Sequence, residues 1–372
     1  MRILADANIT DVQRLFGDLG EVVLFDGRRL TAGDISDGDI LLVRSVTPVD
    51  ASLLAGVQPA FVGSATSGTD HLDIHCLESR QIPWAHAPGS NARSVAEYVF
   101  TAIAQVDDLL ERLFDGGSMG IIGYGHIGRL IGTLCAGMGI RFLAYDPWLE
   151  DSGQVGLSEL GEVLSCDVVT LHADLHDRRP WPSRHLLNAE RLAAIPVLSL
   201  LINAGRGALI SGSDLLAQLR REPQRRVVLD TWENEPRIDP ELLDRCMIAS
   251  AHIAGYSHDG KVLATRMLRE SAGEVLGWPA AQLELTGVGE ALHVPADLEG
   301  AALLRWLLNQ VYDIRADDGR MRAAKGADFD TLRRYYPVRR ELGAYEVRNP
   351  DQLSGPACAL CELWGLTSAI GG

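Results

Sequence analysis

A glycine-rich turn stands in the middle of the chain, where residues 118–128 read Ser-Met-Gly-Ile-Ile-Gly-Tyr-Gly-His-Ile-Gly. In a strand–turn–helix of this kind Gly123 permits the tight bend, Gly125 lets the backbone approach a pyrophosphate, and Gly128 lets the helix pack on the strand. The free N–H groups at the start of the helix then bind the diphosphate. Asp146 follows Gly128 by 18 residues, where its carboxylate can bind both ribose hydroxyls and repel a 2′-phosphate. The pattern predicts a dinucleotide site that prefers NAD to NADP.

Three more polar segments each follow an apolar run, and they contain Arg206, Glu235 and His252. Arg206 lies between two glycines, which leave room for an anion, and its planar guanidinium can bind a carboxylate through two hydrogen bonds. His252 is a natural base for a hydroxyl proton, and Glu235 could orient its ring and stabilise its cation. Read singly, Arg206 could be a surface cation, Glu235 the end of a turn, and His252 an ordinary loop histidine. Together, behind a dinucleotide turn, they predict oxidation of a 2-hydroxy acid.

The elements that must position these residues follow from the apolar periodicity. Short apolar runs alternate with helical stretches, which predicts an α/β fold of parallel sheets covered on both faces, with ligands at the carboxyl ends of the strands. Besides the run before Gly123, strands are expected at residues 2–5, 22–25, 40–43, 60–63, 82–85, 141–145, 167–172, 197–203, 227–231 and 247–250. Helices are expected at residues 94–114, 126–138, 259–277, 301–312 and 329–336, and an irregular connection at 280–300.

Length and composition limit the class of protein. The 372 residues suggest two or three domains, and the net charge of −16 argues against nucleic acid as a partner. An acidic residue, Asp6, occurs too early for a signal peptide, and the apolar run 195–202 is too short to cross a bilayer. We therefore expect a cytoplasmic protein. Cys358 and Cys361 have redox or metal spacing, but no second pair or suitable histidine accompanies them. We expect them to be ordinary small apolar residues, and we expect no metal.

Residues 1–278 resemble the D-2-hydroxyacid dehydrogenase family, whose catalytic arginine, glutamate and histidine match Arg206, Glu235 and His252. The resemblance implies a Rossmann-type doubly wound sheet for the cofactor, residues 93–256, inserted in a flavodoxin-like substrate domain, residues 1–92 and 257–279. Because residues 172–174 read His-Ala-Asp in place of a His-Thr-Pro pattern, a cofactor contact at Ala173 can only be through backbone. The other cofactor contacts that the resemblance implies are His126 and Ile127 at the diphosphate, Asp230 at the nicotinamide amide, and Gly255.

A narrower resemblance, to the erythronate-4-phosphate dehydrogenase family of pyridoxal phosphate synthesis, rests on residues 43–47, 63–71, 87–92, 252–257, 311–318 and 329–341. It implies NAD-dependent oxidation of 4-phospho-D-erythronate, with Ser45, Thr66 and Tyr256 in contact with substrate. Ser90 departs from the usual cysteine. The resemblance also implies that residues 280–372 form a small α+β domain that makes a homodimer. Its expected helix with Trp306, Leu307, Leu308 and Tyr312 looks apolar enough to need a partner surface.

Several alternatives stay open at this point. Arg44, beside Ser45, could receive the 4-phosphate or could pair with an acid of its own domain. The basic residues Arg333, Arg334, Arg339 and Arg340 could also help, but a helix face paired with acids of a partner subunit is favoured. The substrate could be another 2-hydroxy acid such as glycerate or 3-phosphoglycerate, or the chain could be an NAD-sensing scaffold without activity.

Overall fold

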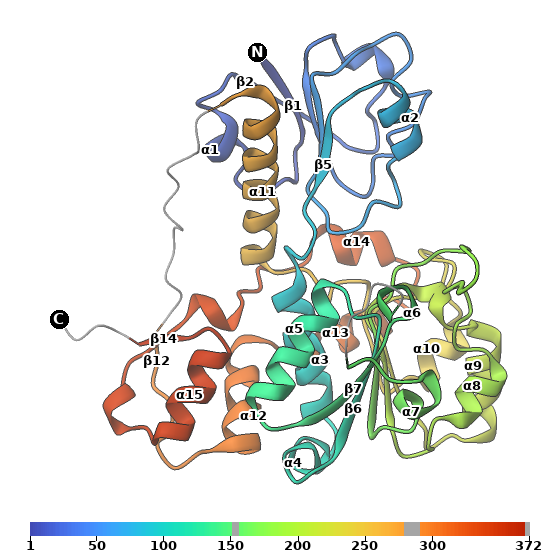
Figure 1. The fold of residues 1–372 in the computed structure, drawn as a ribbon, viewed down its shortest axis with the longest axis vertical. Coiled ribbons are helices and arrows are strands. Elements are labelled where there is room, and N and C mark those ends of the chain that lie inside the picture. Colours follow the sequence, from blue (N-terminus) through green and yellow to red (C-terminus); the bar gives the residue numbers. More distant parts are fainter. Residues whose placement is uncertain (151–155, 279–290, 369–372) are drawn as a thin grey trace. The chain divides into compact units, whose positions relative to one another are not determined.

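The computed structural model describes residues 1–150, 156–278 and 291–368, which form two compact units (Figure 1). One unit comprises Met1–Asn91 with Ser257–Gly287, and the other Ala92–Tyr256 with Val288–Gly372, each as far as it is described. The expected domain boundary after residue 279 and most of the expected irregular connection, residues 280–300, lie outside the described residues. Its described part, residues 291–300, is irregular apart from a short strand at Ala291–Leu292 and the first residue of a helix at Gly300. The C-terminal region groups with the dinucleotide-binding residues, and its separation as a third domain stays a prediction.

The first unit contains one parallel sheet in the order β2-β1-β3-β4-β5, the flavodoxin-like order expected from the resemblance. Its strands β3 and β4 are buried along their whole length, because helices cover both faces. Helix α11 is capped at its start by Ser257, whose hydroxyl accepts the Gly260 N–H, and at its end by Gly277 with a φ of 70°. The elements are β1 (Arg2–Asp6), α1 (Val12–Phe16), β2 (Glu21–Phe25), β3 (Ile40–Val43), β4 (Phe61–Ser64), α2 (Ile74–Ser79), β5 (Trp84–His86) and α11 (His258–Leu276).

The second unit is built on a six-stranded parallel sheet in the order β11-β10-β9-β8-β6-β7. After β6 the chain runs outward to β7 and then returns to β8 on the other side of β6, which creates the switch point where ligands bind in doubly wound sheets. The strands are β6 (Ser118–Ile122), β7 (Arg141–Tyr145), β8 (Val168–Leu171), β9 (Leu200–Asn203), β10 (Arg226–Leu229) and β11 (Ile248–Ala249).

Successive residues of these strands enter two different cores, one on each face of the sheet. Leu200 and Ile202 pack with α3 and α5, whereas Leu201 packs with the helices of the opposite face. This double burial explains the continuous apolar runs in the sequence. The helices are α3 (Ala92–Ala104), α4 (Leu109–Phe114), α5 (His126–Gly137), α6 (Pro147–Glu150), α7 (Leu160–Leu164), α8 (Ala189–Ala194), α9 (Gly212–Arg221) and α10 (Pro240–Arg245).

The expectation of a single helix over residues 94–114 is wrong. The structure has two helices, α3 and α4, separated by residues 105–108. Asp108 takes a left-handed φ of 55°, which aspartate tolerates better than most residues. The guanidinium of Arg305 donates a hydrogen bond to the carbonyl of Ala104, one of the carbonyls freed where α3 ends. A distant side chain therefore helps to stabilise the break.

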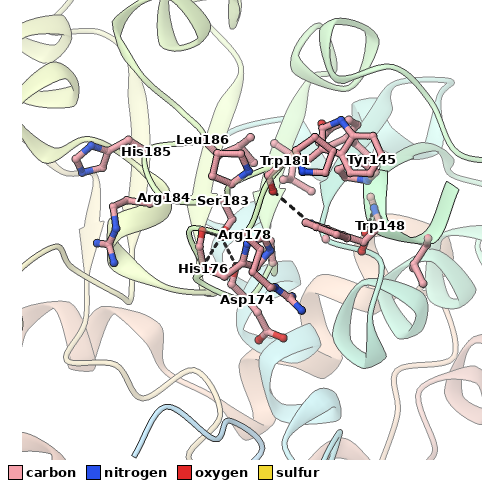
Figure 2. Close-up of a pocket in the computed structure, with 18 of the residues that line it drawn as sticks. Tyr145, Trp148, Asp174, His176, Arg178, Trp181, Ser183, Arg184, His185 and Leu186 are labelled. Carbon is pink, nitrogen blue, oxygen red and sulfur yellow. Dashed lines mark hydrogen bonds between the residues drawn. The ribbon is translucent and has the colours of Figure 1, made fainter. Parts of the chain in front are cut away.

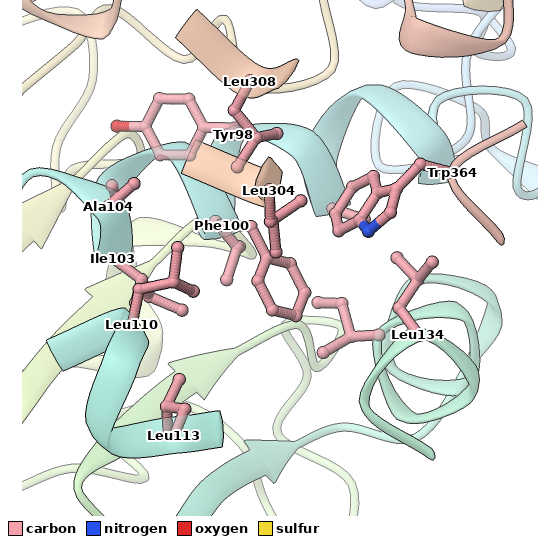
Figure 3. Packing of buried hydrophobic residues seen from close by; sticks show 14 of the residues in the cluster. Tyr98, Phe100, Ile103, Ala104, Leu110, Leu113, Leu134, Leu304, Leu308 and Trp364 are labelled. Carbon is pink, nitrogen blue, oxygen red and sulfur yellow. The ribbon is translucent and has the colours of Figure 1, made fainter. Parts of the chain in front are cut away.

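The C-terminal region adds helices and a three-stranded parallel sheet, β12-β13-β14. Leu307 and Leu308 of α12 are fully buried, and Figure 3 shows Leu304 and Leu308 beside Tyr98 of α3. The expectation that this apolar helix needs a partner surface is therefore wrong, because the same chain covers it. The elements are β12 (Ala291–Leu292), α12 (Gly300–Val311), α13 (Ile314–Ala323), α14 (Phe329–Arg334), β13 (Glu346–Val347), α15 (Gly355–Leu363) and β14 (Thr367–Ser368).

The basic residues of this region do not share one helix face. Helix α14 ends at Arg334, and Arg339 lies beyond it with a side chain only 3% exposed. Arg339 donates hydrogen bonds to the carbonyls of Ala254 and Ser94 at 3.2 and 2.7 Å. The expectation of a helix face paired with a partner subunit is thus wrong for Arg339, which is bonded inside its own chain.

Across residues 1–150, 156–278 and 291–368, no helix combines the length and apolar character that crossing a bilayer requires.

Candidate active site

The glycine-rich turn after β6 has the geometry that its sequence predicts. Gly123 takes a φ of 90°, and a Cβ there would lie 2.3 Å from the backbone nitrogen of Ala173. A Cβ on Gly128 would lie 2.2 Å from the carbonyl oxygen of Gly123, so α5 approaches the turn too closely for a side chain. A Cβ on Gly125 would meet nothing within 4 Å. Two glycines therefore allow close packing, and the third leaves open backbone at the start of the helix, where a pyrophosphate fits.

Asp146 follows β7 and faces this turn. Its Oδ2 accepts the Tyr124 N–H at 2.9 Å and its Oδ1 accepts the Trp148 N–H at 3.2 Å. A cavity of about 440 Å³ opens beside it, and Gly123, Gly125, Asp146 and Ala173 all contribute to its lining. Four of the expected cofactor residues thus border one cavity at the switch point of the sheet. Their chemistry, open backbone and a carboxylate, fits NAD.

Two tryptophans that the sequence reasoning missed also line this cavity. The Trp148 indole donates to the carbonyl of Trp181 at 3.3 Å, and the two rings meet edge to face with centroids 5.4 Å apart (Figure 2). The guanidinium of Arg178 lies 5.0 Å from the centre of the Trp148 ring. The only signal in the sequence was the position of Trp148, two residues after the expected acid. Trp181 comes from a loop with no recognisable motif.

Asp230, at the end of β10, organises the loop that follows β11. Its carboxylate is fully buried and accepts hydrogen bonds from the Ser250 hydroxyl at 2.6 Å and from the N–H groups of Ile253 and Ala254 at 2.7 and 2.9 Å. Burial raises the pKa of Asp230, and these donors oppose the rise. The backbone carbonyl of Asp230 also accepts the His252 N–H at 2.7 Å. The loop that carries His252 is therefore tied to β10 through Asp230.

His252 and Glu235 lie within hydrogen-bonding distance, with Nδ1 2.9 Å from Oε2. The other carboxylate oxygen of Glu235 accepts the Trp232 N–H at 2.7 Å. Burial would raise the pKa of Glu235, but the charge and hydrogen bond of His252, the Trp232 N–H and the charge of Arg333 outweigh it, so the pKa is lowered. The carboxylate thus stays ionised at neutral pH. With Nδ1 held by Glu235, Nε2 is the imidazole nitrogen that is left to exchange a proton.

Arg206 follows β9 in a turn fixed by Asn203, which accepts the Gly205 N–H at 3.2 Å and donates to the Arg206 carbonyl at 3.0 Å. A Cβ on Gly207 would lie 2.0 Å from the carbonyl of Trp232, so this turn packs directly on the loop that contains Glu235. Because β9, β10 and β11 are neighbours in the sheet, the three loops share one edge. The structure therefore brings together the segments that carry Arg206, Glu235 and His252.

The expected substrate residues fall in both units. In the first unit Ser45 is exposed, and the Thr66 hydroxyl lies 2.7 Å from that of Ser64. Arg44 forms an ion pair with the buried Asp6, with 3.2 Å between Nε and Oδ1, so the alternative of a pairing within its own domain is what the structure shows. In the second unit Tyr256 packs edge-on against another aromatic residue of the same unit.

The remaining expected residues occupy the same strand ends. His126 and Ile127 begin α5, directly after the open backbone of Gly125, and Gly255 lies in the loop held by Asp230. Among the described residues no group of three or more His, Cys, Asp and Glu side chains is arranged to hold a metal ion. The described cysteines are all free thiols, and Cys361 is buried.

Comparison with known proteins gives two family models. The model described as D-isomer specific 2-hydroxyacid dehydrogenase, NAD binding domain, matches residues 92–254. A second model, a domain of unknown function (DUF3410), matches residues 290–358. The first match covers the six-stranded sheet and the loops described above, and the second covers most of the C-terminal region.

Curated relatives match along nearly the whole chain. The erythronate-4-phosphate dehydrogenase of Cellvibrio japonicus is 42% identical over 94% of this chain and 95% of its own length. That of Marinobacter nauticus is 40% identical over 94% of each chain. Among solved structures, D-lactate dehydrogenase from Aquifex aeolicus, complexed with NAD and lactic acid, has a TM-score of 0.59 at 20% identity and covers 74% of this chain and 96% of its own. The 3-phosphoglycerate dehydrogenase of Entamoeba histolytica, with NAD bound, gives the same TM-score and identity over 74% and 94%.

Proposed function

Because this chain belongs to the erythronate-4-phosphate dehydrogenases, within the NAD-dependent D-isomer-specific 2-hydroxyacid dehydrogenases, we propose that it oxidises 4-phospho-D-erythronate. The product is (R)-3-hydroxy-2-oxo-4-phosphooxybutanoate. The single observation that carries the assignment is identity of 42% over nearly the full length of an enzyme with this name, including the C-terminal region. The His252–Glu235 pair at 2.9 Å, behind a dinucleotide turn, supports an active enzyme rather than a scaffold.

Each residue of the proposed site has a separate task. Arg206 binds the C1 carboxylate, because a guanidinium matches its two oxygens. His252 takes the C2 hydroxyl proton at Nε2, and Glu235 stabilises the imidazolium that results. NAD, when bound, accepts the hydride from C2. Ser45, Thr66 and Tyr256 contact the rest of the substrate.

The proposed cofactor contacts lie at the carboxyl ends of the strands of the second unit. Backbone at Gly125, followed by His126 and Ile127, holds the diphosphate at the start of α5. Asp146 binds the ribose hydroxyls, and Ala173 contributes its backbone. Asp230 and Gly255 hold the nicotinamide end. The open space at Gly125 and the cavity beside Asp146 support these roles.

We also propose that the enzyme is a cytoplasmic homodimer joined through its C-terminal region. Tyr335 and Val338, next to α14, are 74% and 81% exposed, which is unusual for large apolar side chains. Replacing both by glutamate should shift the particle mass from dimer to monomer in light scattering, without loss of secondary structure by circular dichroism. A dimer that persists in this variant would place the interface elsewhere.

The test of function is a panel of 2-hydroxy acids, each with and without a terminal phosphate, with reduction of NAD followed by absorbance. We expect 4-phospho-D-erythronate to give the highest kcat/KM. Faster turnover of glycerate or 3-phosphoglycerate would assign a different dehydrogenase. Tight NAD binding without turnover of any acid would favour the scaffold.

A further inference from the structure

Arg333 stands close to Tyr256, although almost eighty residues separate them in sequence. Its guanidinium carbon lies 5.5 Å from the centre of the Tyr256 ring. The same ring meets Tyr336 edge to face, with centroids 5.9 Å apart and planes at 83°. The sequence reasoning had favoured a partner subunit for Arg333, whereas this structure places it against a proposed substrate residue of its own unit.

The charge of Arg333 also reaches the proposed proton-transfer pair. Burial raises the pKa of Glu235. The charge and hydrogen bond of His252, the Trp232 N–H and the charge of Arg333 lower it, with Arg333 contributing least. Arg333 thus influences the charge of the proposed proton-transfer pair, in addition to its contact with Tyr256.

The backbone that carries Arg333 is firmly attached to the six-stranded sheet. Helix α13 is bound to the edge strand β11 through Asp318, which accepts the Ala249 N–H at 2.9 Å. Arg322 of α13 donates to the carbonyl of Cys246 at 2.7 Å. Phe329 at the start of α14 is 1% exposed and packs in the same core as Met321. The position of the Arg333 backbone is thus fixed by buried contacts.

One donor of Arg333 has no acceptor. Its Nε is buried, and no hydrogen-bond partner for it exists among residues 1–150, 156–278 and 291–368. A buried donor without a partner is unfavourable, so a ligand that supplies the acceptor is favoured. The edge of a guanidinium formed by Nε and one terminal nitrogen suits two oxygens of a phosphate.

The proposed substrate carries two anionic groups, a carboxylate at C1 and a phosphate at C4, and it needs a cation for each. Arg206 is proposed for the carboxylate. The Nε of Arg44 also has no hydrogen-bond partner among the described residues, but it lies 3.2 Å from the buried carboxylate of Asp6, which already balances its charge. We propose that Arg333, supplied by the C-terminal region, binds the 4-phosphate of the substrate beside Tyr256. This proposal rests on the proposed function, since it names the group that recognises the phosphate of that substrate.

The experiment compares 4-phospho-D-erythronate with D-erythronate, which lacks the phosphate, in the full-length enzyme with NAD. Arg333→Gln should lower kcat/KM for the phosphorylated acid roughly 10- to 100-fold, mainly through KM, because a hydrogen bond to a charged group contributes 1.5–3 kcal/mol. The loss for D-erythronate should be clearly smaller, so that the preference for the phosphorylated acid over D-erythronate falls roughly ten-fold or more. Arg333→Lys should recover part of the loss, because it restores the charge without the planar geometry. The neighbouring exposed residue gives the matched control, and Arg334→Gln should behave as wild type for both acids.

Other outcomes would overturn the proposal. An equal loss for both acids in Arg333→Gln would mean that Arg333 acts on Glu235 or Tyr256 and not on the phosphate. Unchanged kinetics in Arg333→Gln, with a selective loss in Arg44→Gln, would assign the phosphate to Arg44. If the wild-type enzyme shows no preference for the phosphorylated acid, the proposed function itself fails, and this result is separate from any variant. Unfolding midpoints and NAD affinity of each variant show whether the protein is intact.

Discussion

Two regions of the second unit meet at the same sheet edge but differ in how they are encoded. The strand-end loops (residues 203–207, 230–235 and 250–256) carry the proposed chemistry, and each lies within a few residues of a buried strand. The C-terminal segment (residues 313–342) was recognised only by its resemblance to a narrower family, with no local pattern that indicates a role, yet it contacts these loops through Arg333 and Arg339. The comparison teaches that groups which react can be found by local spacing, whereas groups which position them arrive from far along the chain.

Removing the proposed base should have the largest effect. In His252→Asn we expect kcat to fall roughly 10²- to 10⁴-fold, the usual contribution of a positioned acid or base. Binding of NAD, followed by fluorescence, should persist. Adding Glu235→Gln should cost little more, because residues that act as one unit are not additive. Turnover near wild type in His252→Asn would remove this histidine from the mechanism. It would also contradict the idea that local spacing identifies the reacting groups.

The C-terminal segment is tested by Arg339→Met, which leaves Glu97 buried without its partner. The two side chains are 3% and 0% exposed and lie 3.6 Å apart, and burial raises the pKa of Glu97 to about 8 in spite of Arg339. We expect a loss of about 1–3 kcal/mol in the free energy of unfolding, measured in urea, because the buried carbonyls of Ala254 and Ser94 lose their donor. Glu97→Gln in the same chain should recover part of it.

The exposed Arg334→Gln is the control for that series and should leave stability unchanged. If Arg339→Met lowers kcat as well as stability, the bond to the Ala254 carbonyl positions the His252 loop. A variant as stable as wild type would show that the segment does not support the strand-end loops.

Arg206→Lys tests the proposed carboxylate-binding residue of the strand-end loops. An ammonium group cannot bind two carboxylate oxygens in the planar geometry of a guanidinium, so substrate binding should weaken. We expect KM to rise roughly 10- to 100-fold, with a smaller change in kcat. A change confined to kcat would instead indicate a role for Arg206 in the reaction step.

Asp146→Ala tests whether the residue that selects NAD can also be identified from local spacing. The carboxylate lies at the end of β7, and its loss should raise the KM for NAD roughly ten-fold and relax discrimination against NADP. Steady-state kinetics with both cofactors measure the ratio. An unaltered preference for NAD would show that another residue selects the cofactor.

At neutral pH the smallest expected effect concerns His172, which follows β8. Burial lowers its pKa from 6.5 to about 3. The folded protein therefore binds one proton fewer than the unfolded chain between these values, and stability falls as the pH drops below 6.5, by about 1.4 kcal/mol per pH unit. His172→Gln keeps a polar partner for Thr170 and should reduce this slope in urea unfolding. An identical slope would assign the acid sensitivity to other groups.

The sequence predicted the parts of the fold that depend on local pattern. The apolar runs located the strands of both large sheets, because strands buried on two faces are mostly apolar. The break between α3 and α4 was missed, since it depends on Arg305 at the Ala104 carbonyl. The two tryptophans of the cofactor cavity and the buried Arg339 were missed for the same reason, because tertiary contacts alone define their roles.

The bond from Asp318 to the Ala249 N–H has a consequence for solubility. Strand β11 is the outermost strand of its sheet, and an outermost strand with unpaired N–H groups is a template on which another chain can add a strand. Helix α13 lies against β11, and Asp318 occupies a donor that such an added strand would need. The C-terminal region thereby protects the parallel sheet from edge-to-edge aggregation.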